Sequence, residues 1–327
     1  MNNVMVSICC TAYNHEKYIS DALEGFVNQK TNFTYEVLVH DDASTDRTAA
    51  IIREYEQKYP DLLNVIYQKE NQYSKGVGIL EDILCTNAKG KYIALCEGDD
   101  YWTDPLKLQK QVDYMEEHPD CHLCFTNGKR EEAGTITDRI VPCTHVSRIV
   151  YKPGDADYDM GEMAQLEVIP TASMLFRTED IRSFPQFSPD AFTGDLALRL
   201  YMSGLGYAHC IDEDTCVYRA QIPGSVTGGW KEDELKFANF LPRVNITLDD
   251  LNEITQGKYN LQLENAKLRN EMQIYFILND YKKLRQKRFH KLRRSDGMLE
   301  YGKYLIRVYI PAIYKILDGI RKKRAQY

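Results

Sequence analysis

The sequence predicts an α/β fold in which helices flank a mostly parallel central sheet, with a helical extension at the C-terminal end. Short apolar runs alternate with helical patterns through the first half of the chain, and this alternation is typical of layered α/β domains. Strand patterns fade beyond about residue 226, where helical spacing takes over. We therefore expect a first domain over residues 1–225 and a helical, basic region over residues 226–327.

Each predicted element follows from its apolar spacing and its end signals. Residues 4–10 form an apolar run of strand length, and apolar residues recur every three or four positions over residues 18–27, which predicts a helix. The expected strands are 4–10, 35–40, 63–67, 92–96, 121–126 and 173–177, with a strand or turn over 210–219. Four expected helices cover residues 18–27, 77–87, 261–284 and 299–320. Three others are expected to begin near Ser44 or Thr45, near Pro105 and near Asp195. Residues 128–165 are polar and rich in turn formers, which predicts a loop-rich insertion.

The charge distribution limits the classes of partner. The formal net charge is −7, but residues 281–327 hold 15 Lys and Arg against 3 Asp and Glu, so this tail carries +12 and residues 1–280 carry −19. An acidic body repels nucleic acid, and we expect no nucleic-acid partner. A basic tail is attracted to anionic surfaces, including lipid headgroups.

The tail also contains an apolar stripe, which Pro311 is expected to divide. The stripe consists of Leu305, Val308, Ile313, Ile316, Leu317 and Ile320. Such a stripe fits packing on the rest of the chain or on a second subunit, and it also fits an amphipathic helix at a membrane surface. We expect a homo-oligomer or peripheral membrane contact through these C-terminal helices as the two alternatives to internal packing.

The cysteines and the N-terminal end favour a cytoplasmic location, either free or at the inner face of the cell membrane. Nine cysteines are scattered through a chain whose start lacks the pattern of a secretion signal, which predicts buried free thiols. Residues 121–124, Cys-His-Leu-Cys, have the spacing of half a zinc site. No second pair follows at a suitable distance, so we expect a strand there.

Polar clusters follow the first, second and fourth expected strands, at residues 11–14, 41–42 and 97–100. Because the carboxyl ends of parallel strands meet at one edge of a sheet, we expect these clusters to surround one ligand. The closely spaced carboxylates of Glu97, Asp99 and Asp100 repel one another unless a cation neutralises them. Mg²⁺ or Mn²⁺ fits this role, although capping of the following helix explains Asp99 and Asp100 equally well.

Common phosphate-binding motifs are missing. The first strand is not followed by Gly-x-Gly-x-x-Gly, and no Walker sequence occurs in the chain. If phosphates bind here, we expect a metal ion to hold them instead of a glycine-rich loop.

These segments resemble family 2 glycosyltransferases. The segments that carry the resemblance are Val6-Ser7-Ile8 through Tyr13-Asn14, Glu36 through Asp46, Tyr92 through Leu95 into Glu97-Gly98-Asp99-Asp100, and Trp102 through Val112. The likeness covers roughly residues 4–225 and extends to bacterial members that build capsular and other surface polysaccharides. It implies the Rossmann-like A-type glycosyltransferase fold. It also implies inverting, metal-dependent transfer of a sugar from a nucleotide-diphosphate donor to a hydroxyl of a glycan or lipid-linked acceptor.

The resemblance also implies roles for individual residues. Thr11, Tyr13 and Asp42 match nucleotide contacts, in a pattern that favours a UDP-sugar. Glu97, Asp99 and Asp100 match the family's Asp-x-Asp region, where carboxylates meet the ribose and the metal. Because Glu97 replaces the commoner first Asp, Asp100 is the best candidate for the metal, with Asp99 beside it.

The later part of the resemblance implies a catalytic base and a basic lining residue. Asp195, in Thr193-Gly194-Asp195-Leu196, matches the carboxylate that accepts the acceptor's proton, although Gly194 stands where the family commonly has an acidic residue and a helix cap is the alternative. Arg219 and Ser225 are expected to line the site. Gln221 stands where the family often has a His, so the role of that His does not transfer.

Two other functions stay open at this point. A non-catalytic protein that binds sugar nucleotides or carbohydrate would keep the fold and tolerate the changes at Glu97, Gly194 and Gln221. A nucleotidyltransferase would also need paired carboxylates and a metal, but it would be expected to have a glycine-rich loop after the first strand. We further expect His40 to be a packed neighbour, Asn71 and Lys75 to be loop residues, and Tyr101 and Trp102 either to stack on a sugar or to pack in the core.

Overall fold

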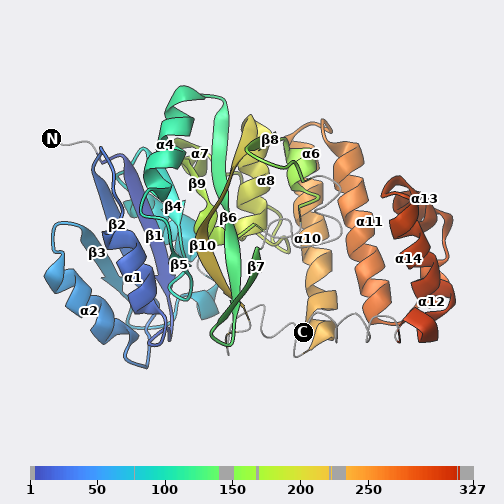
Figure 1. Cartoon of the computed structure of the whole chain (residues 1–327), viewed down its shortest axis with the longest axis horizontal. Helices are drawn as coiled ribbons and strands as arrows, with labels where there is room; N and C mark the ends of the chain where they lie inside the picture. The colour runs from blue at the N-terminus through green and yellow to red at the C-terminus, as the bar shows by residue number, and fades with distance from the viewer. Residues whose placement is uncertain are drawn as a thin grey trace. The chain divides into compact units, whose positions relative to one another are not determined.

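The computed structural model describes residues 4–76, 78–139, 151–166, 169–220, 222, 233–314 and 316. The chain divides into two compact units, Met1–Gln186 with Thr193–Ser225, and Phe187–Phe192 with Val226–Tyr327. The first unit contains the sheet, and the second contains the C-terminal helices (Figure 1). The predicted α/β fold, with a helix-flanked central sheet and a helical C-terminal extension, is confirmed.

The parallel part of the sheet comes from the N-terminal half of the chain. Its strands are β1 (Val6–Ala12), β2 (Tyr35–Asp41), β3 (Leu63–Tyr67) and β4 (Tyr92–Leu95), in the spatial order β3-β2-β1-β4. The helices α1 (Ile19–Val27) and α2 (Thr48–Lys58) connect the first three strands (Figure 1). Since β1 pairs with a parallel strand on each side, nearly all of its side chains are buried, which explains its continuous apolar run.

The rest of the sheet is mixed. Its strands are β9 (Leu175–Arg177), β6 (Cys121–Glu132), β10 (Tyr207–Ala220), β5 (Tyr101–Trp102), β7 (Thr135–Arg139) and β8 (Ala156–Tyr158). In the part of the chain that the structure describes, β6 and β10 are the only parallel pair here, and the other pairs are antiparallel. The parallel pairing expected from the sequence therefore holds for β1 to β4 and for the pair β6 and β10, in a sheet with ten strands among the described residues.

The loop-rich insertion predicted over residues 128–165 is wrong at its start. Strand β6 runs on to Glu132 and turns at Gly134 into β7. The polar residues 128–132 form a strand because β10 pairs with them on one side and β7 on the other, which satisfies their backbone groups. Because residues 128–132 are polar, they lack the alternation of apolar and polar residues from which a strand is predicted. Residues 140–150 of the insertion lie outside the described residues.

The helix predicted over residues 77–87 is also different. This segment contains a π-helix over Ile79–Leu84 and a single α-turn, α3 (Cys85–Asn87). The side chains of Thr86 and Asn87 donate hydrogen bonds back to the carbonyl of Ile83, and the Asp82 carboxylate accepts one from the Gly78 N–H. These side chains compete with a regular helical ladder, which explains the irregular turn.

Trp102 belongs to the core. Its ring lies edge-on to Phe26 with ring centroids 5.0 Å apart, and its indole N–H donates to the carbonyl of Ala172. The ammonium of Lys107, at the start of α4 (Lys107–Glu117), lies 4.2 Å from the Trp102 ring centroid, and burial lowers the pKa of Lys107 to about 8. Of the two predicted roles for Trp102, core packing is therefore the correct one.

The remaining elements of the first unit are short, apart from one helix. They are α6 (Met160–Met163), the 3-10 turns Tyr73–Lys75 and Thr171–Ser173, α7 (Thr178–Arg182) and α8 (Asp195–Leu205). All eight cysteines of the described chain are free and buried, which confirms the thiol prediction for that part. Two of them, Cys121 and Cys124, face the core from β6, as expected for a strand.

The second unit is helical. Its helices are α10 (Glu234–Ile254), α11 (Asn260–Ile277), α12 (Tyr281–Leu284), α13 (Lys287–Ser295) and α14 (Met298–Tyr309). The predicted helix 261–284 is interrupted, because Asn279 adopts a positive φ of 55° between α11 and α12. Sequence analysis missed α10, which contains Pro242 in its interior. Helix α14 ends before Pro311, as predicted.

The short segment Phe187–Phe192 is bonded to the helices of the second unit. The hydroxyl of Ser188 donates to the carboxylate of Asp250 at 2.7 Å, and the hydroxyl of Thr247 donates to the carbonyl of Phe192 at 2.7 Å. Within the described ranges no helix is long and apolar enough to cross a membrane.

Gly90 provides a test of the packing between β1 and the turn before β4. An added Cβ would lie 2.5 Å from the Ser7 nitrogen and 2.8 Å from the Tyr92 carbonyl oxygen, both of which are backbone atoms. We expect Gly90→Ala to lower the free energy of unfolding by about 1–3 kcal/mol, measured by urea denaturation. Gly302→Ala is the control, because nothing lies within 4 Å of its Cβ position. Equal stability of the two variants would contradict this packing.

Candidate functional site

The three loops predicted to meet at the carboxyl edge of the sheet do meet. The N–H of Gly98 donates to the carbonyl of Thr11 at 2.8 Å, and the N–H of Asp42 donates to the carbonyl of Ala12 at 2.9 Å. The Asn14 side chain accepts a hydrogen bond from the Thr45 N–H at 2.8 Å. These backbone contacts join the loops after β1, β2 and β4 into one surface.

The loop after β4 brings three carboxyl groups close together. Asp100 is buried, and its Oδ1 accepts the N–H of Arg219 at 2.8 Å. Burial raises the pKa of Glu97 to about 8, and the charge of Asp99 adds to the rise. Burial likewise raises the pKa of Asp100 well above its ordinary value, with Glu97 and Asp99 contributing. The loop therefore favours any ligand that brings positive charge.

A divalent cation fits these residues by donor chemistry. Within the described residues, the buried Oε2 of Glu97 has no hydrogen-bond partner. No set of three or more His, Cys, Asp or Glu side chains in the described part of the chain is arranged as a metal site. Mg²⁺ and Mn²⁺ commonly bind through one or two carboxylates and take their other ligands from water and substrate phosphates. The arrangement thus suits a metal that arrives with a phosphorylated ligand.

His15 is a site residue that sequence analysis missed. Its Nε2 lies 3.9 Å from Oδ2 of Asp99, and its Nδ1 would be 3.0 Å from a Cβ at residue 98. Burial lowers the pKa of His15, which opposes the raising effect of the acidic groups around it. A polar residue directly after the loop of the first strand was the available signal. His40, in contrast, is fully buried in β2, as expected of a packed neighbour.

Two of the predicted nucleotide contacts differ in their surroundings. The Tyr13 side chain is 45% exposed and accessible to a ligand. Asp42 is buried, and its carboxylate accepts the N–H groups of Gln72 at 2.7 Å and Tyr73 at 3.1 Å. Asp42 therefore holds the loop after β3 in addition to any contact with a ligand.

That loop contains Asn71 and Lys75. The Asn71 side chain donates to the carbonyl of Asp42 at 3.2 Å, and Lys75 forms an exposed ion pair with Glu70. Both residues thus have local structural partners, in agreement with the loop interpretation.

Arg219 secures the acidic loop from the side of β10. Its guanidinium donates to the carboxylates of Asp21 and Glu131 and to the carbonyl of Asp99, and it lies 4.4 Å from the Tyr101 ring centroid. These contacts use the faces and edges of the guanidinium. In this structure Arg219 positions the acidic loop, and the predicted contact with the ligand stays a prediction.

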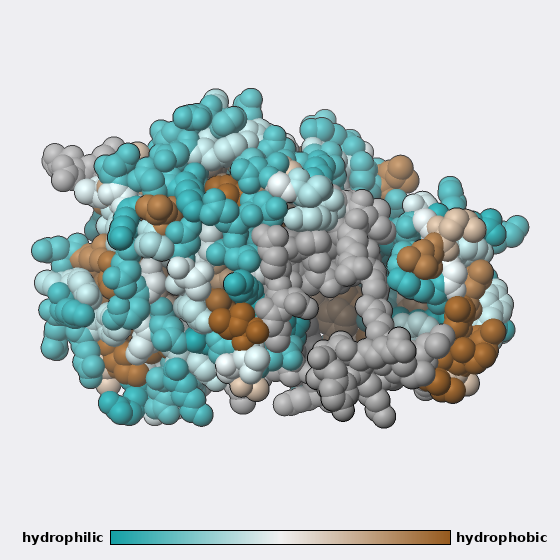
Figure 2. All heavy atoms as spheres, viewed as in Figure 1, coloured by the Kyte–Doolittle hydropathy of each residue, from teal (hydrophilic) through white to brown (hydrophobic). Residues whose placement is uncertain are grey.

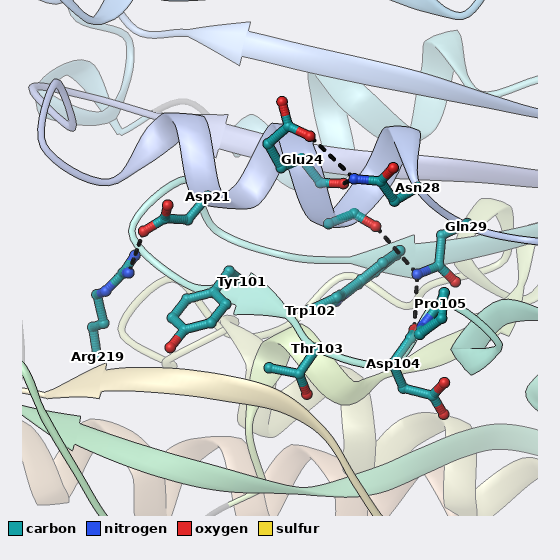
Figure 3. A pocket seen from close by; sticks show the side chains of 11 residues that line it. Asp21, Glu24, Asn28, Gln29, Tyr101, Trp102, Thr103, Asp104, Pro105 and Arg219 are labelled. Atoms are coloured by element: carbon teal, nitrogen blue, oxygen red, sulfur yellow. Dashed lines mark hydrogen bonds and ion pairs between the residues drawn. The ribbon is translucent and has the colours of Figure 1, made fainter.

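A pocket of about 500 Å³ lies between α1 and residues 101–105, with Arg219 at one end (Figure 3). Its polar side chains are bonded to one another and to the nearby backbone. The Gln29 side chain donates to the carbonyl of Asp104 at 2.9 Å, and the Glu24 carboxylate accepts from Asn28 at 3.1 Å. Because these groups are already paired, we do not assign the main ligand to this pocket.

Asp195 is the first residue of α8, after the cap residue Gly194. Its Oδ1 accepts the N–H of Leu196 at 2.8 Å, and its charge contributes to the raised pKa of Glu97. Asp195 thus belongs to the electrostatic environment of the acidic loop. Thr171, which hydrogen-bonds Glu97, was not identified from the sequence. Gln221 and Ser225 lie outside the described residues.

Comparison with known families identifies the chain. A model of the family described as "Glycosyl transferase family 2" matches residues 7–178, more than half of the chain. The chain belongs to glycosyltransferase family 2. The matched range contains the three loops that meet at the sheet edge, and it ends before Asp195 and Arg219.

Two relatives of the chain differ in their identity to it and in how much of it they cover. EpsE of Bacillus subtilis, which is named as a glycosyltransferase, is 34% identical over 230 residues, covering 66% of this chain and 81% of EpsE. Uncharacterized protein Rv1520 of Mycobacterium tuberculosis is 39% identical over 175 residues, covering 53% of this chain. The chain spans 43% of the length of that mycobacterial relative.

Solved structures share the fold at low identity. TarS of S. aureus in complex with UDP-GlcNAc has a TM-score of 0.56 at 17% identity, covering 93% of this chain and 91% of that chain. The mannosyltransferase PcManGT from Pyrobaculum calidifontis, in complex with GDP-Man and Mn²⁺, has a TM-score of 0.59 at 15% identity, covering 98% and 84%. These similarities support the A-type glycosyltransferase fold.

Asp42 offers a test of the loop architecture. In Asp42→Ala the N–H groups of Gln72 and Tyr73 lose their carboxylate acceptor, and we expect the free energy of unfolding to fall by about 1–3 kcal/mol. Urea denaturation measures the change. Asp61→Ala, at an exposed position, serves as the control and is expected to leave stability nearly unchanged. A loss no greater than that of the control would show that Asp42 does not hold this loop.

Proposed function

We propose that this family 2 enzyme transfers a sugar from a nucleotide-diphosphate donor, with a UDP-sugar favoured, to a hydroxyl of a glycan or lipid-linked acceptor. The observation that carries the proposal is that Thr11, Asp42 and the acidic loop, residues 97–100, meet at one edge of the sheet. The charge of Asp195 also raises the pKa of Glu97 in this loop. We assign catalysis to residues 1–225. The process we favour is bacterial surface polysaccharide synthesis, and a cytoplasmic location stays a prediction.

Named complexes of structural neighbours support a nucleotide-sugar donor. TarS was solved with UDP-GlcNAc, and PcManGT with GDP-Man and Mn²⁺. Both nucleotides carry a diphosphate, which matches the need of the acidic loop for a ligand that arrives with a cation. The two neighbours differ in base, so our preference for uridine rests on Thr11, Tyr13 and Asp42.

The donor would lie across the joined loops. In this proposal the exposed Tyr13 ring stacks on the base, and Thr11 and Asp42 lie beside the nucleoside. Glu97 contacts the ribose, and Asp100 with Asp99 would hold Mn²⁺ or Mg²⁺. A bound divalent cation would stabilise the negative charge that develops on the leaving diphosphate.

Asp195 supplies the base in the proposed step. Its carboxylate accepts the proton of the acceptor hydroxyl while that oxygen bonds to the anomeric carbon of the donor sugar. The bond between this carbon and the diphosphate oxygen breaks at the same time, and its electron pair leaves with the nucleoside diphosphate. A single displacement of this kind inverts the anomeric centre. A positioned general base contributes roughly 10²- to 10⁴-fold in rate.

Substitution of the base and of the metal ligand should have different effects. We expect Asp195→Asn to reduce transfer by roughly 10²- to 10⁴-fold while nucleotide affinity changes little, because the variant lacks only the proton acceptor. Asp100→Asn should weaken Mn²⁺-dependent nucleotide binding as well as transfer. Calorimetric titration of UDP with Mn²⁺, beside a transfer assay, measures both quantities, and Asp61→Asn is the surface control. Undiminished transfer in Asp195→Asn would remove Asp195 from this role.

Ligand-dependent stability provides a test that needs no acceptor. We expect UDP-sugars to raise the Tm in the presence of Mn²⁺, and we expect EDTA to abolish the increase, because the diphosphate depends on the cation. A thermal-shift panel of UDP, GDP and CDP derivatives measures this. Stabilisation by a different base would correct the donor, and equal stabilisation in EDTA would contradict the metal. Release of a nucleoside diphosphate, not pyrophosphate, would distinguish sugar transfer from nucleotidyl transfer.

A further inference from the structure

Helix α14 has two apolar faces, and only one of them is packed inside the second unit. Tyr304 and Val308 are buried in a cluster with Phe276, Leu284 and Phe289. Leu305, part of the stripe noted in the sequence, packs against the same cluster. Internal packing therefore accounts for Leu305 and Val308, whereas Ile313 and Ile316 are exposed. Leu317 and Ile320 lie outside the described residues.

The second face carries exposed apolar side chains. We call them the outer patch, which consists of Met298, Leu299, Ile306, Tyr309 and Ile310. Leu299, Ile306 and Ile310 are spaced by seven and four residues, so they share one side of the helix and its end. Their exposed fractions are 73%, 37% and 49%.

The concentration of apolar exposure here is unusual for this chain. Of the 16 large apolar side chains exposed in the described residues, seven lie between Met298 and Ile316. Figure 2 shows apolar residues, in brown, gathered over the helices that Figure 1 labels α12 to α14. Single exposed apolar residues are normal, whereas a contiguous group indicates an interaction surface.

The same segment is strongly basic. Residues 281–314 contain ten Lys and Arg and two Asp and Glu, a net charge of +8. Both acids are already neutralised, since Asp296 pairs with Arg269 and Arg293, and Glu300 pairs with Arg293 and Lys303. Lys283 and Arg288 pair with Asp280 and Glu271, which precede this segment. Most of the other basic side chains of α12 and α13 are exposed.

Basic groups also border the outer patch. The Arg285 guanidinium lies 4.9 Å from the ring centroid of Tyr309. Lys303 is four residues after Leu299 and three before Ile306, which places it on the same side of α14. Aliphatic side chains flanked by long basic ones are typical of surfaces that sit at a lipid interface, where the apolar groups enter and the charges reach the headgroups.

We propose that the outer patch docks on an anionic lipid surface. Charge favours this occupant over a second copy of the chain, because two copies joined through this patch would bring two segments of +8 together. Each basic side chain near an anionic leaflet strengthens binding about fivefold. The inference concerns the second unit alone and does not depend on the proposed sugar transfer.

Flotation with vesicles tests the proposal on the full chain. We expect the chain to float with vesicles of phosphatidylcholine and phosphatidylglycerol, and to float far less with phosphatidylcholine alone. Ile306→Ser with Ile310→Ser should weaken binding to the anionic vesicles at least tenfold, because both side chains leave the apolar interface. Lys287→Ala with Lys291→Ala should weaken it most at low salt, where electrostatic attraction is least screened.

A matched control separates the patch from general apolar exposure. Leu261 is 70% exposed in the same unit, but it lies near the start of α11, whereas the contact with α14 involves Phe276 near the end of that helix. Leu261→Ser should leave flotation unchanged. A circular dichroism melt verifies that each variant is folded. The proposal would be overturned if the wild-type chain remained at the bottom of the gradient and did not float with the anionic vesicles.

Two further outcomes would also overturn it. Equal flotation of the wild type and the Ile306→Ser, Ile310→Ser variant would show that another surface binds lipid. A dimer that dissociates in this variant, measured by light scattering in the absence of vesicles and without wild-type flotation, would assign the outer patch to a second copy of the chain.

Discussion

The convergence of three carboxyl groups in one tight loop is the constraint on which the candidate site depends. Burial raises the pKa of Glu97 and of Asp100, with the charge of Asp99 contributing, and Arg219 holds the loop through hydrogen bonds to Asp99 and Asp100. Gly98 is required between Glu97 and Asp99, because a Cβ there would lie 2.8 Å from the Ile19 side chain and 3.2 Å from the Thr11 carbonyl. The absence of a side chain at residue 98 lets the β1 and β4 loops approach closely.

The elements and loops that could be predicted from the sequence are those with a distinctive local composition. The buried run of β1 and the acidic loop after β4 were visible because each has a distinctive composition, and the sheet-edge rule brought the corresponding loops together. His15 and Thr171 were missed because their closeness to the acidic loop depends on tertiary structure. No sequence pattern around His15 or Thr171 predicts that they lie beside the acidic loop.

The differences between the predicted and the observed elements have a common origin. The polar half of β6 is a strand because β7 and β10 surround it, and the irregular turn near Thr86 reflects side chains that bond to the backbone. In α10, helical packing overrides the signal of Pro242. In each case partners distant in sequence, or local side-chain bonds, outweigh the periodicity that predicts an element. The functional motifs were less affected, because they lie at the ends of well-predicted strands.

The path of the chain has a practical consequence for dissecting this protein. Residues 187–192 belong to the second unit although both flanking segments belong to the first, so the backbone crosses between the units three times. A fragment that stops after residue 225 would retain Ser188 and Phe192 but lose their partners Asp250 and Thr247. A single cut after residue 225 would therefore leave residues 187–192 without the helices that they contact.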